Sequence, residues 1–494
     1  IAANQKFPLA YLNLGELYVF GVGHHDIKKA IYYYTLASNH NISLASYYLG
    51  KLYEEGEYVQ HDINRAIYYY SLSAELNDPD ALFTLGNLYE YGDFFPPDLQ
   101  KAFDYYLKAA ELNDYKAQNT LGNFYFIGKY VKKDLEKAFE YYMLSASQNN
   151  PIAQLHVGEY YYHGYIFPYD IDCAIHYFLL AANAKVKEAQ NYLGLIYENE
   201  KKYKDINKAI YYYTLSSDQK YPDALYNLGK MFIEGKNISI DINKSIKYFT
   251  IDATLNCPEA QEYLGNIYFT NKYGKYNISK SIFYYRQASR QDFPNSQYML
   301  GIIYLFGLNG FQDSSKAIHY LKLASNRYFV FAEYTLGIIY FDGQIVDRDI
   351  NESIHYFKDA SSLNCQYAKN NLGIIYKNGI EVKQNIYFAI ELFNEAIKQE
   401  NDEISMYNLA HIYFYGEGVE TDFVKAKDLL VASSKKNFMS SKILLCLLLI
   451  KKVEIVDLNS IKNEIQNDEL SLELYQMITH FNIINTIIYQ YLFN

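Results

Sequence analysis

A twelve-residue pattern recurs along almost the whole chain and constrains the fold more than any other feature of the sequence. It is clearest at residues 81–92, which read ALFTLGNLYEYG. Its central glycine, Gly86, has counterparts 35 or 36 residues apart at Gly15, Gly50, Gly122, Gly158, Gly194, Gly229, Gly265, Gly301, Gly337 and Gly373. Ala410 and Cys446 hold the same place further along. A period of this length, kept this strictly, predicts a solenoid of stacked two-element repeats.

The first half of each repeat has the apolar spacing of an amphipathic helix, which we call helix A. In the repeat that contains Gly86, the side chains of Ala81, Leu85 and Leu88 fall on one helical face. A glycine inside a helix costs about 1 kcal/mol relative to alanine. The recurrence of Gly86 therefore predicts that a facing helix approaches closely at this point. Gly92 is expected to end the helix in the left-handed conformation, which glycine adopts without strain.

The second half of each repeat predicts a second helix, helix B. Asp98 precedes it and is a favoured N-cap, because its carboxylate accepts hydrogen bonds from free amides of the first turn. Ala102, Tyr105 and Tyr106 then share one face, and Asn113 ends the helix in the left-handed conformation. Equivalent aspartates recur at Asp26, Asp62, Asp134, Asp170, Asp205, Asp241, Asp313, Asp349 and Asp422. Capping explains each of them separately, so we predict no metal site.

The combined pattern, A-x-x-x-L-G-x-x-Y-x-x-G followed by D-x-x-K-A-x-x-Y-Y-x-x-A-A, resembles the Sel-one-like repeat family, relatives of the tetratricopeptide repeat. The resemblance covers about residues 2–446. It implies an all-α fold, an α/α superhelical solenoid of about twelve two-helix repeats of 35–37 residues with a C-terminal helical cap. We expect residues 1–9 to end a preceding truncated repeat, residues 10–440 to form the twelve repeats, and residues 441–494 to hold a degenerate repeat and capping helices.

Composition limits the classes of partner. The net charge of −11 and the isoelectric point near 5.5 argue against a nucleic-acid partner, which needs a basic face. The longest apolar run, residues 443–450, is far shorter than the roughly 18 residues of a membrane helix, so we expect no direct membrane insertion. The four cysteines lack the spacing of a zinc site or a disulfide framework. The oligomeric state stays open.

No set of residues has the pattern of a catalytic site. The chain lacks a phosphate-binding glycine loop, a zinc-protease motif, a nucleophile elbow and a dinucleotide fingerprint. We therefore predict a protein that is not an enzyme, with no catalytic, cofactor-binding or metal-binding residues and no cofactor. Some bacterial relatives are described as weak β-lactamases, but they carry a cysteine pair in each repeat, and this chain does not. An enzyme domain upstream of residue 1 stays an open alternative.

The variable positions of helix A change character along the chain. One and four residues after the glycine, early repeats carry mostly charged or polar side chains, whereas later repeats carry apolar ones. The early side chains include Glu16, Lys51, Glu54, Asn87 and Glu90. The later side chains include Phe269, Ile302, Leu305, Ile338, Phe341 and Ile374. In the family, helix A lines the concave side of the solenoid, so we expect these positions, Glu90 among them, to be exposed there.

An apolar surface that spans neighbouring repeats is typical of an interaction site. We predict that a protein or peptide ligand docks on six residues, which we call the apolar strip: Tyr298, Ile302, Leu305, Tyr334, Ile338 and Phe341. The alternative is that tighter curvature buries these side chains within the solenoid.

The family resemblance implies a non-enzymatic scaffold or adaptor that binds protein or peptide partners on the concave helix A face. Family members include adaptors of ubiquitin ligases in endoplasmic-reticulum-associated degradation. That role, or the role of a regulatory module attached to an upstream enzyme domain, is the alternative. Unpaired cysteines and the lack of a visible signal peptide favour the cytoplasm. The ubiquitin ligase role would instead place the chain in the endoplasmic reticulum lumen.

Overall fold

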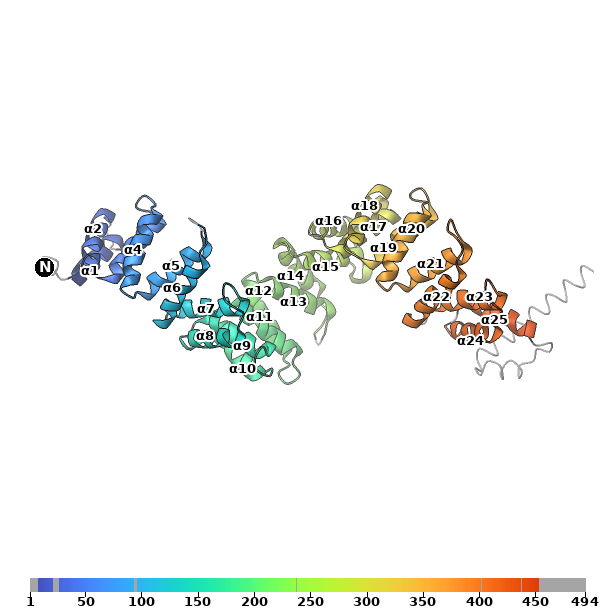
Figure 1. Cartoon of the computed structure of the whole chain (residues 1–494), viewed down its shortest axis with the longest axis horizontal. Coiled ribbons are helices and arrows are strands. Elements are labelled where there is room, and N and C mark those ends of the chain that lie inside the picture. Colours follow the sequence, from blue (N-terminus) through green and yellow to red (C-terminus); the bar gives the residue numbers. More distant parts are fainter. Residues whose placement is uncertain are drawn as a thin grey trace, which may run out of the picture. The chain divides into compact units, whose positions relative to one another are not determined.

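The computed structural model describes residues 8–20, 26–92, 96–236, 238–400, 402–436 and 438–452. Within these ranges the chain forms twenty-five α-helices and two short 3-10 helices, and no strand (Figure 1). The predicted all-α solenoid of two-helix repeats is therefore confirmed. The capping helices expected after residue 452 lie outside the described residues.

Helices A carry odd numbers and helices B carry even numbers. Helices A are α1 (Pro8–Phe20), α3 (Ser43–Glu55), α5 (Pro79–Tyr91), α7 (Tyr115–Ile127), α9 (Pro151–His163), α11 (Lys187–Asn199), α13 (Pro222–Glu234), α15 (Pro258–Phe269), α17 (Pro294–Phe306), α19 (Val330–Asp342), α21 (Gln366–Asn378), α23 (Glu403–Tyr415) and α25 (Met439–Lys452). Helices B are α2 (Ile27–Ser38), α4 (Ile63–Glu75), α6 (Leu99–Glu111), α8 (Leu135–Ser147), α10 (Ile171–Asn183), α12 (Ile206–Asp218), α14 (Ile242–Thr254), α16 (Ile278–Ser289), α18 (Ser314–Ser325), α20 (Ile350–Ser362), α22 (Ile386–Glu400) and α24 (Phe423–Ser434). The 3-10 helices are η2 (Asn271–Tyr273) and η3 (Leu308–Gly310).

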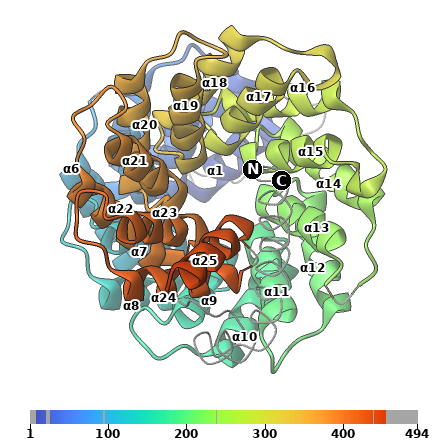
Figure 2. The ribbon, with the colours of Figure 1, turned by 90° about the vertical axis from the view of Figure 1, so that its right-hand side faces the viewer.

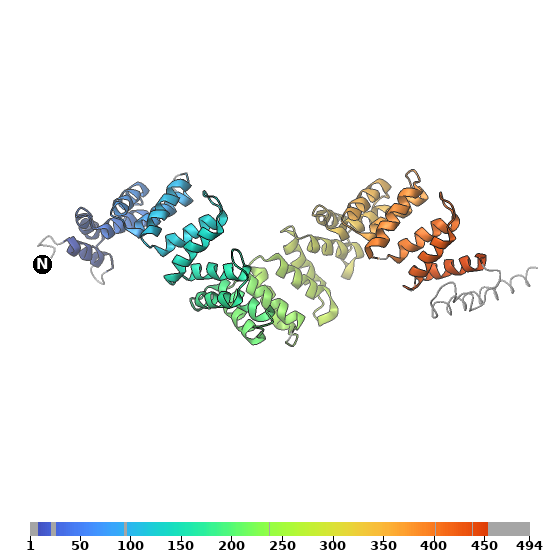
Figure 3. The same ribbon diagram turned by 60° about the horizontal axis from the view of Figure 1, so that its bottom comes forward.

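The helices fall into two compact units, Ile1–Asp252 and Ala253–Asn494. Within each unit the two helices of one repeat pack most extensively, as α3 with α4 or α17 with α18, and the repeats follow one another in chain order (Figure 3). In the second unit, α21 also contacts α19 and α23, whereas the described helices B do not approach each other this closely. Figure 2 shows α17, α19 and α21 toward the inner side of the curve and α18 and α20 toward the outer side. Helices A therefore form the concave face of this unit.

In most repeats the helix A glycine is the point where an aromatic ring of helix B packs against helix A, and at Gly301 the helix B residue is Leu321. A Cβ on Gly86 would lie 2.5 Å from the buried ring of Tyr106, and a Cβ on Gly229 would lie 2.6 Å from the ring of Phe249. The Ser353 hydroxyl of α20 donates to the Gly337 carbonyl of α19 at 2.8 Å. The predicted close approach is confirmed, and the ring of helix B fills the space that a side chain would need.

The predicted helix ends are also confirmed. The Asp98 carboxylate accepts a hydrogen bond from the Lys101 amide at 3.0 Å and caps α6. Gly92 ends α5 with φ of 63°, and Asn113 follows α6 with φ of 66°. These caps use the free amides and carbonyls that each helix end leaves unpaired, so they fix the length of each helix independently of its neighbours.

A buried position of helix A, four residues before the glycine, is polar in many repeats. Gln118 donates from Nε2 to the Ala110 carbonyl at 3.3 Å, at the end of the preceding helix B, where the Asn113 amide also donates to this carbonyl at 2.9 Å. The same position of α19 holds Glu333, only 2% exposed, and its Oε2 finds no hydrogen-bond partner among the described residues. Burial raises the pKa of Glu333, because a carboxylate loses its hydration there.

Glu333→Gln is expected to stabilise the fold at neutral pH by about 1–3 kcal/mol, because an amide replaces a buried, unpaired carboxylate oxygen. The raised pKa of Glu333 in the folded state means that ionisation costs stability as the pH rises above the unfolded value of 4.5. Thermal melts should therefore show little difference from the parent below that pH and a growing gain up to pH 7. Glu391→Gln, at an exposed site on α22, is the control. An equal gain at pH 4 and pH 7 would contradict the explanation.

Candidate functional site

All six residues of the apolar strip are half-buried. They lie on α17 and α19, two consecutive helices A. The structure thus falls between the two alternatives, because the side chains are neither enclosed between helices nor fully surrounded by water. Part of each side chain stays accessible to a ligand.

The two tyrosines of the strip fill the seams between consecutive helices A. The ring of Tyr298 packs 5.3 Å from Phe329, which precedes α19, and 6.1 Å from Phe331. The ring of Tyr334 packs 5.9 Å from Tyr367 of α21. Phe331 and Tyr367 are exposed. The aromatic surface therefore extends beyond the six residues that the sequence predicted.

Sequence reasoning missed Phe331 and Tyr367 because both lie six residues before the helix A glycine, an offset outside the three that define the strip. In the third and fourth repeats this offset holds Asp80 and Lys116, which form an ion pair at 3.0 Å, whereas the first two repeats carry Leu9 and Leu44. The residue type at this offset varies without a trend along the chain, so the sequence carries no signal that would have singled out Phe331 and Tyr367.

Ile338 and Phe341 of the strip line a pocket of about 290 Å³ between α19 and α21. We call it the α19–α21 pocket, and it is lined by Ile338, Phe341, Asp342, Phe357, Asn371 and Ile374. Phe357 belongs to α20 and is buried, with its ring against Gly337, so it forms the bottom of the pocket. The other four strip residues do not line the pocket.

The helix B residue at the bottom of the pocket affects which side chains the helix A face can carry. In several repeats this helix B residue is a tyrosine, and its hydroxyl passes the glycine to reach the helix A face. The Tyr106 hydroxyl lies 2.7 Å from the Asn87 side-chain oxygen and 2.6 Å from the Glu90 carboxylate, and these two acceptors share its single proton. Tyr142 donates to Asn123 at 2.7 Å in the next repeat. A polar residue at these positions therefore satisfies a buried hydroxyl.

Three consecutive repeats of the second unit have no hydroxyl at this place. Their helix B residues are Leu321, Phe357 and Phe393, and the residues 19 positions earlier are Ile302, Ile338 and Ile374. A buried hydroxyl without a partner costs about 1–3 kcal/mol, so the lack of a hydroxyl allows an apolar residue at these helix A positions but does not require one, since Phe178 and Phe249 lie opposite Glu159 and Lys230. The apolar strip is thus paired with an apolar layer beneath it.

The expectation that Glu90 is exposed is wrong. Its side chain is only 9% exposed, because it accepts from the Tyr106 hydroxyl and pairs with the Lys129 ammonium at 2.8 Å. The charged positions of the early repeats therefore have a structural role in addition to any contact with a ligand.

Polar groups surround the α19–α21 pocket. The Arg348 guanidinium lies 5.6 Å from the centre of the Phe341 ring and 3.6 Å from the Glu381 carboxylate. Burial raises the pKa of Tyr334, and a hydrogen bond with Asn371 opposes that rise. An apolar centre with a polar rim is the usual anatomy of a protein interface.

The periodic aspartates cap helices, as predicted. Within the described part of the chain, no three His, Cys, Asp or Glu side chains gather where they could hold a metal ion. In the same ranges, the helices are all too short or too polar to span a bilayer.

The fold and the concave face define an α-helical repeat protein of the kind typical of protein-interaction scaffolds. The sequence model of the Sel1 repeat matches twelve segments, residues 8–42, 43–78, 79–114, 116–150, 151–186, 187–221, 222–251, 258–293, 294–328, 330–365, 366–401 and 404–438. The chain therefore belongs to the Sel1 repeat family.

Two solved structures illustrate the similarity. A protective antigen present in uropathogenic Escherichia coli strains, with an SLR fold, is 24% identical with a TM-score of 0.67, over 91% of this chain and 94% of that one. A Sel1 repeat protein from Oxalobacter formigenes is 26% identical with a TM-score of 0.51, over 62% of this chain and 90% of that one. A search of curated proteins finds no match.

Proposed function

We propose that the chain is a non-enzymatic scaffold that binds an apolar segment of a partner protein across α17, α19 and α21. One large apolar side chain of the partner enters the α19–α21 pocket. The observation that carries the proposal is this pocket, in which Ile338, Phe341 and Ile374 surround the buried ring of Phe357. The exposed aromatic side chains of neighbouring helices A extend the surface on which the rest of the segment lies.

The chemistry of the pocket selects an apolar ligand. A volume of about 290 Å³ holds a leucine, isoleucine or phenylalanine side chain, and burial of such a group stabilises a complex by about 1.5–3 kcal/mol. An anionic side chain at the same place would lose its hydration over Phe357 and would be repelled by the Asp342 carboxylate. Recognition of apolar side chains at regular spacing by a helix-lined surface is a common mode of peptide binding.

The narrower roles implied by the family resemblance stay predictions. They are an adaptor of a ubiquitin ligase in endoplasmic-reticulum-associated degradation and a regulatory module of an upstream enzyme domain. The cytoplasmic location and the alternative location in the endoplasmic reticulum lumen stay predictions as well.

Polar substitutions at two pocket residues test the proposal, and together they should preserve the fold. Phe357→Tyr alone should lower the free energy of unfolding by about 1–2 kcal/mol, because Ile338 and Phe341 stand where Asn87 and Glu90 accept from Tyr106. Combined with Ile338→Asn, it recreates the tyrosine–asparagine pair seen at Tyr142 and Asn123. The double variant should therefore be more stable than the sum of its single variants predicts.

The double variant should differ from the parent in its affinity for apolar peptides. Peptides selected from a random library on the parent chain should bind the double variant about thirtyfold more weakly, since an apolar anchor contributes about 2 kcal/mol. Fluorescence anisotropy measures the affinity, and urea unfolding measures the stability. Parental affinity in a double variant that unfolds like the parent would rule out the pocket as the binding site.

A further inference from the structure

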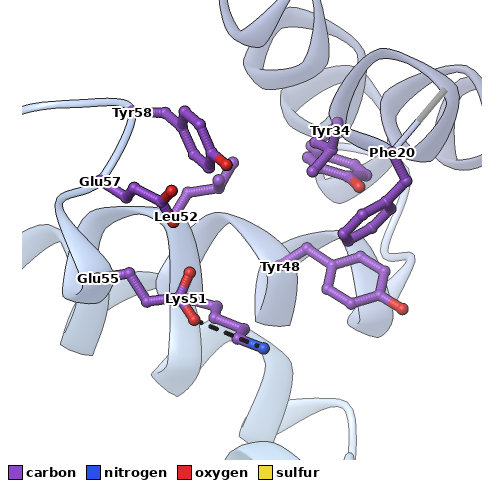
Figure 4. A pocket seen from close by; sticks show the side chains of 9 residues that line it. Phe20, Tyr34, Tyr48, Lys51, Leu52, Glu55, Glu57 and Tyr58 are labelled. Carbon is purple, nitrogen blue, oxygen red and sulfur yellow. Dashed lines mark ion pairs between the residues drawn. The ribbon is translucent and has the colours of Figure 1, made fainter. Parts of the chain in front are cut away.

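The first unit contains a second pocket, unlike the first in its chemistry. It has a volume of about 270 Å³ and lies beside α1, α2, α3 and the loop after α3. We call it the α1–α3 pocket, and it is lined by Val19, Phe20, Tyr34, Tyr48, Lys51, Leu52, Glu55, Glu57 and Tyr58. Figure 4 shows Phe20, Tyr34 and Tyr48 on one side of the space, and Tyr58, Glu57 and Glu55 on the other.

Four aromatic rings surround this space. Tyr34 is buried at its base, and its ring centre lies 5.5 Å from that of Tyr48. Phe20 and Tyr58 stand at the opening, 74% and 47% exposed. Aromatic faces carry partial negative charge and attract a cation within about 6 Å of the ring centre. Two rings this exposed contribute little to the core, and their faces are accessible to a ligand.

Carboxylates give the lining a net negative charge. The Lys51 ammonium lies 3.6 Å from the Glu55 carboxylate, so these two charges neutralise each other. Glu57 adds a further carboxylate at the opening, and its hydrogen bond to the Tyr58 hydroxyl raises the pKa of that tyrosine. Burial and the Glu16 carboxylate raise the pKa of Tyr34 and Tyr48 in the same way. The tyrosines therefore stay neutral, and the carboxylates supply the charge.

The charge of the surrounding repeats has the same sign. Residues 8–114, the first three repeats, contain fifteen acidic and six basic side chains, a net charge of −9 out of −11 for the whole chain. The later repeats are close to neutral. Because such a field raises the local concentration of cations and speeds their association, it favours a basic ligand at this end of the chain.

We propose that the α1–α3 pocket binds an arginine side chain from a basic segment of a partner protein. The flat guanidinium stacks on the rings of Phe20 and Tyr58, and its fork of N–H groups donates to the Glu57 carboxylate. An apolar side chain would cover this carboxylate without pairing it, and an anion would be repelled. This site is independent of the apolar surface on the second unit and does not rest on the function proposed for it.

Matched peptides test the proposal on the full chain. One fluorescent peptide carries a single arginine between glycine and serine residues, and a second carries citrulline, which has nearly the same shape without the charge. The arginine peptide should bind about tenfold more tightly than the citrulline peptide, as expected for one cation–π and carboxylate contact. Equal affinities, or no binding of the arginine peptide, would overturn the proposal.

Two substitutions with the same change of charge distinguish binding by the pocket carboxylate from the effect of the overall negative charge. Glu57→Gln should remove most of the preference for arginine over citrulline. Glu136→Gln, at an exposed site on α8 in the same unit, should leave that preference unchanged. Circular dichroism confirms that both variants keep the parental helix content. An equal loss of preference in both variants would show that only the net charge acts, and would overturn the specific site.

Discussion

Gly229→Val is expected to lower the free energy of unfolding by about 3 kcal/mol, the upper range for an overpacked core. The Cβ of the new side chain would lie 2.6 Å from the ring of Phe249, which is fully buried, so the ring or the helix must shift. The helix itself gains slightly from the loss of glycine, so the destabilisation must come from the collision with the ring. Urea unfolding monitored by circular dichroism measures the effect.

A double-mutant cycle identifies the cause of this loss. Phe249→Ala removes the ring, so Gly229→Ala should destabilise the parent and be neutral or stabilising in the Phe249→Ala background. Lys230→Val, on the next residue of the same helix and half-buried, is the control for a β-branched side chain in α13. If Gly229→Ala had the same effect in both backgrounds, the glycine would not be explained by the aromatic ring.

Ile302→Asp combined with Ile338→Asp is expected to weaken the binding of an apolar peptide by more than about a hundredfold, because each anchor contributes about 2 kcal/mol when central. A carboxylate at either place would also have to lose its hydration when the ligand covers it. Both isoleucines are half-buried, so the fold should survive the change. Anisotropy with peptides selected on the parent chain gives the affinity.

The control for this variant removes an apolar side chain from the other side of the repeats. Tyr387 lies on α22 and is highly exposed, so Tyr387→Asp should leave the affinity for the selected peptides unchanged. A folded Ile302→Asp and Ile338→Asp variant that binds the peptides as the parent does would exclude the apolar strip as the binding surface.

The fold could be predicted because the same local sequence signals recur in each repeat. An aspartate such as Asp98 begins helix B, and Gly92 and Asn113 end the helices through conformations that few other residues adopt easily. Such signals act within a few residues, so they do not depend on how the repeats pack. The structure has the predicted caps at these places.

The surface was harder to predict because it depends on contacts between the two helices of a repeat. Nothing near Glu90 in the sequence shows that the Tyr106 hydroxyl reaches its carboxylate from the other side of the helix. The rotation of helix B about its own axis decides this contact. A comparison of positions 19 residues apart contains part of the missing information, because Tyr106 and Tyr142 lie opposite Asn87 and Asn123, which accept their hydroxyl protons.

Only part of the candidate site could be predicted, because the rest also depends on contacts between helices. Ile338 and Phe341 line the α19–α21 pocket, whereas Tyr298 and Tyr334 pack in the seams beside it. Helical periodicity placed all of them on one face, but the distinction between a seam and a pocket requires the spacing of neighbouring helices. That spacing is a property of the stacked repeats and is absent from any single repeat.

Methyl NMR of the isoleucine side chains, with and without a selected apolar peptide, tests the proposed binding site most directly. Ile338 and Ile374 line the α19–α21 pocket, and Ile210 lies in the other unit on α12. We expect the methyl signals of Ile338 and Ile374 to shift on saturation with the peptide, while the signal of Ile210 stays in place. A peptide that binds tightly and leaves the signals of Ile338 and Ile374 unchanged would contradict the proposed function.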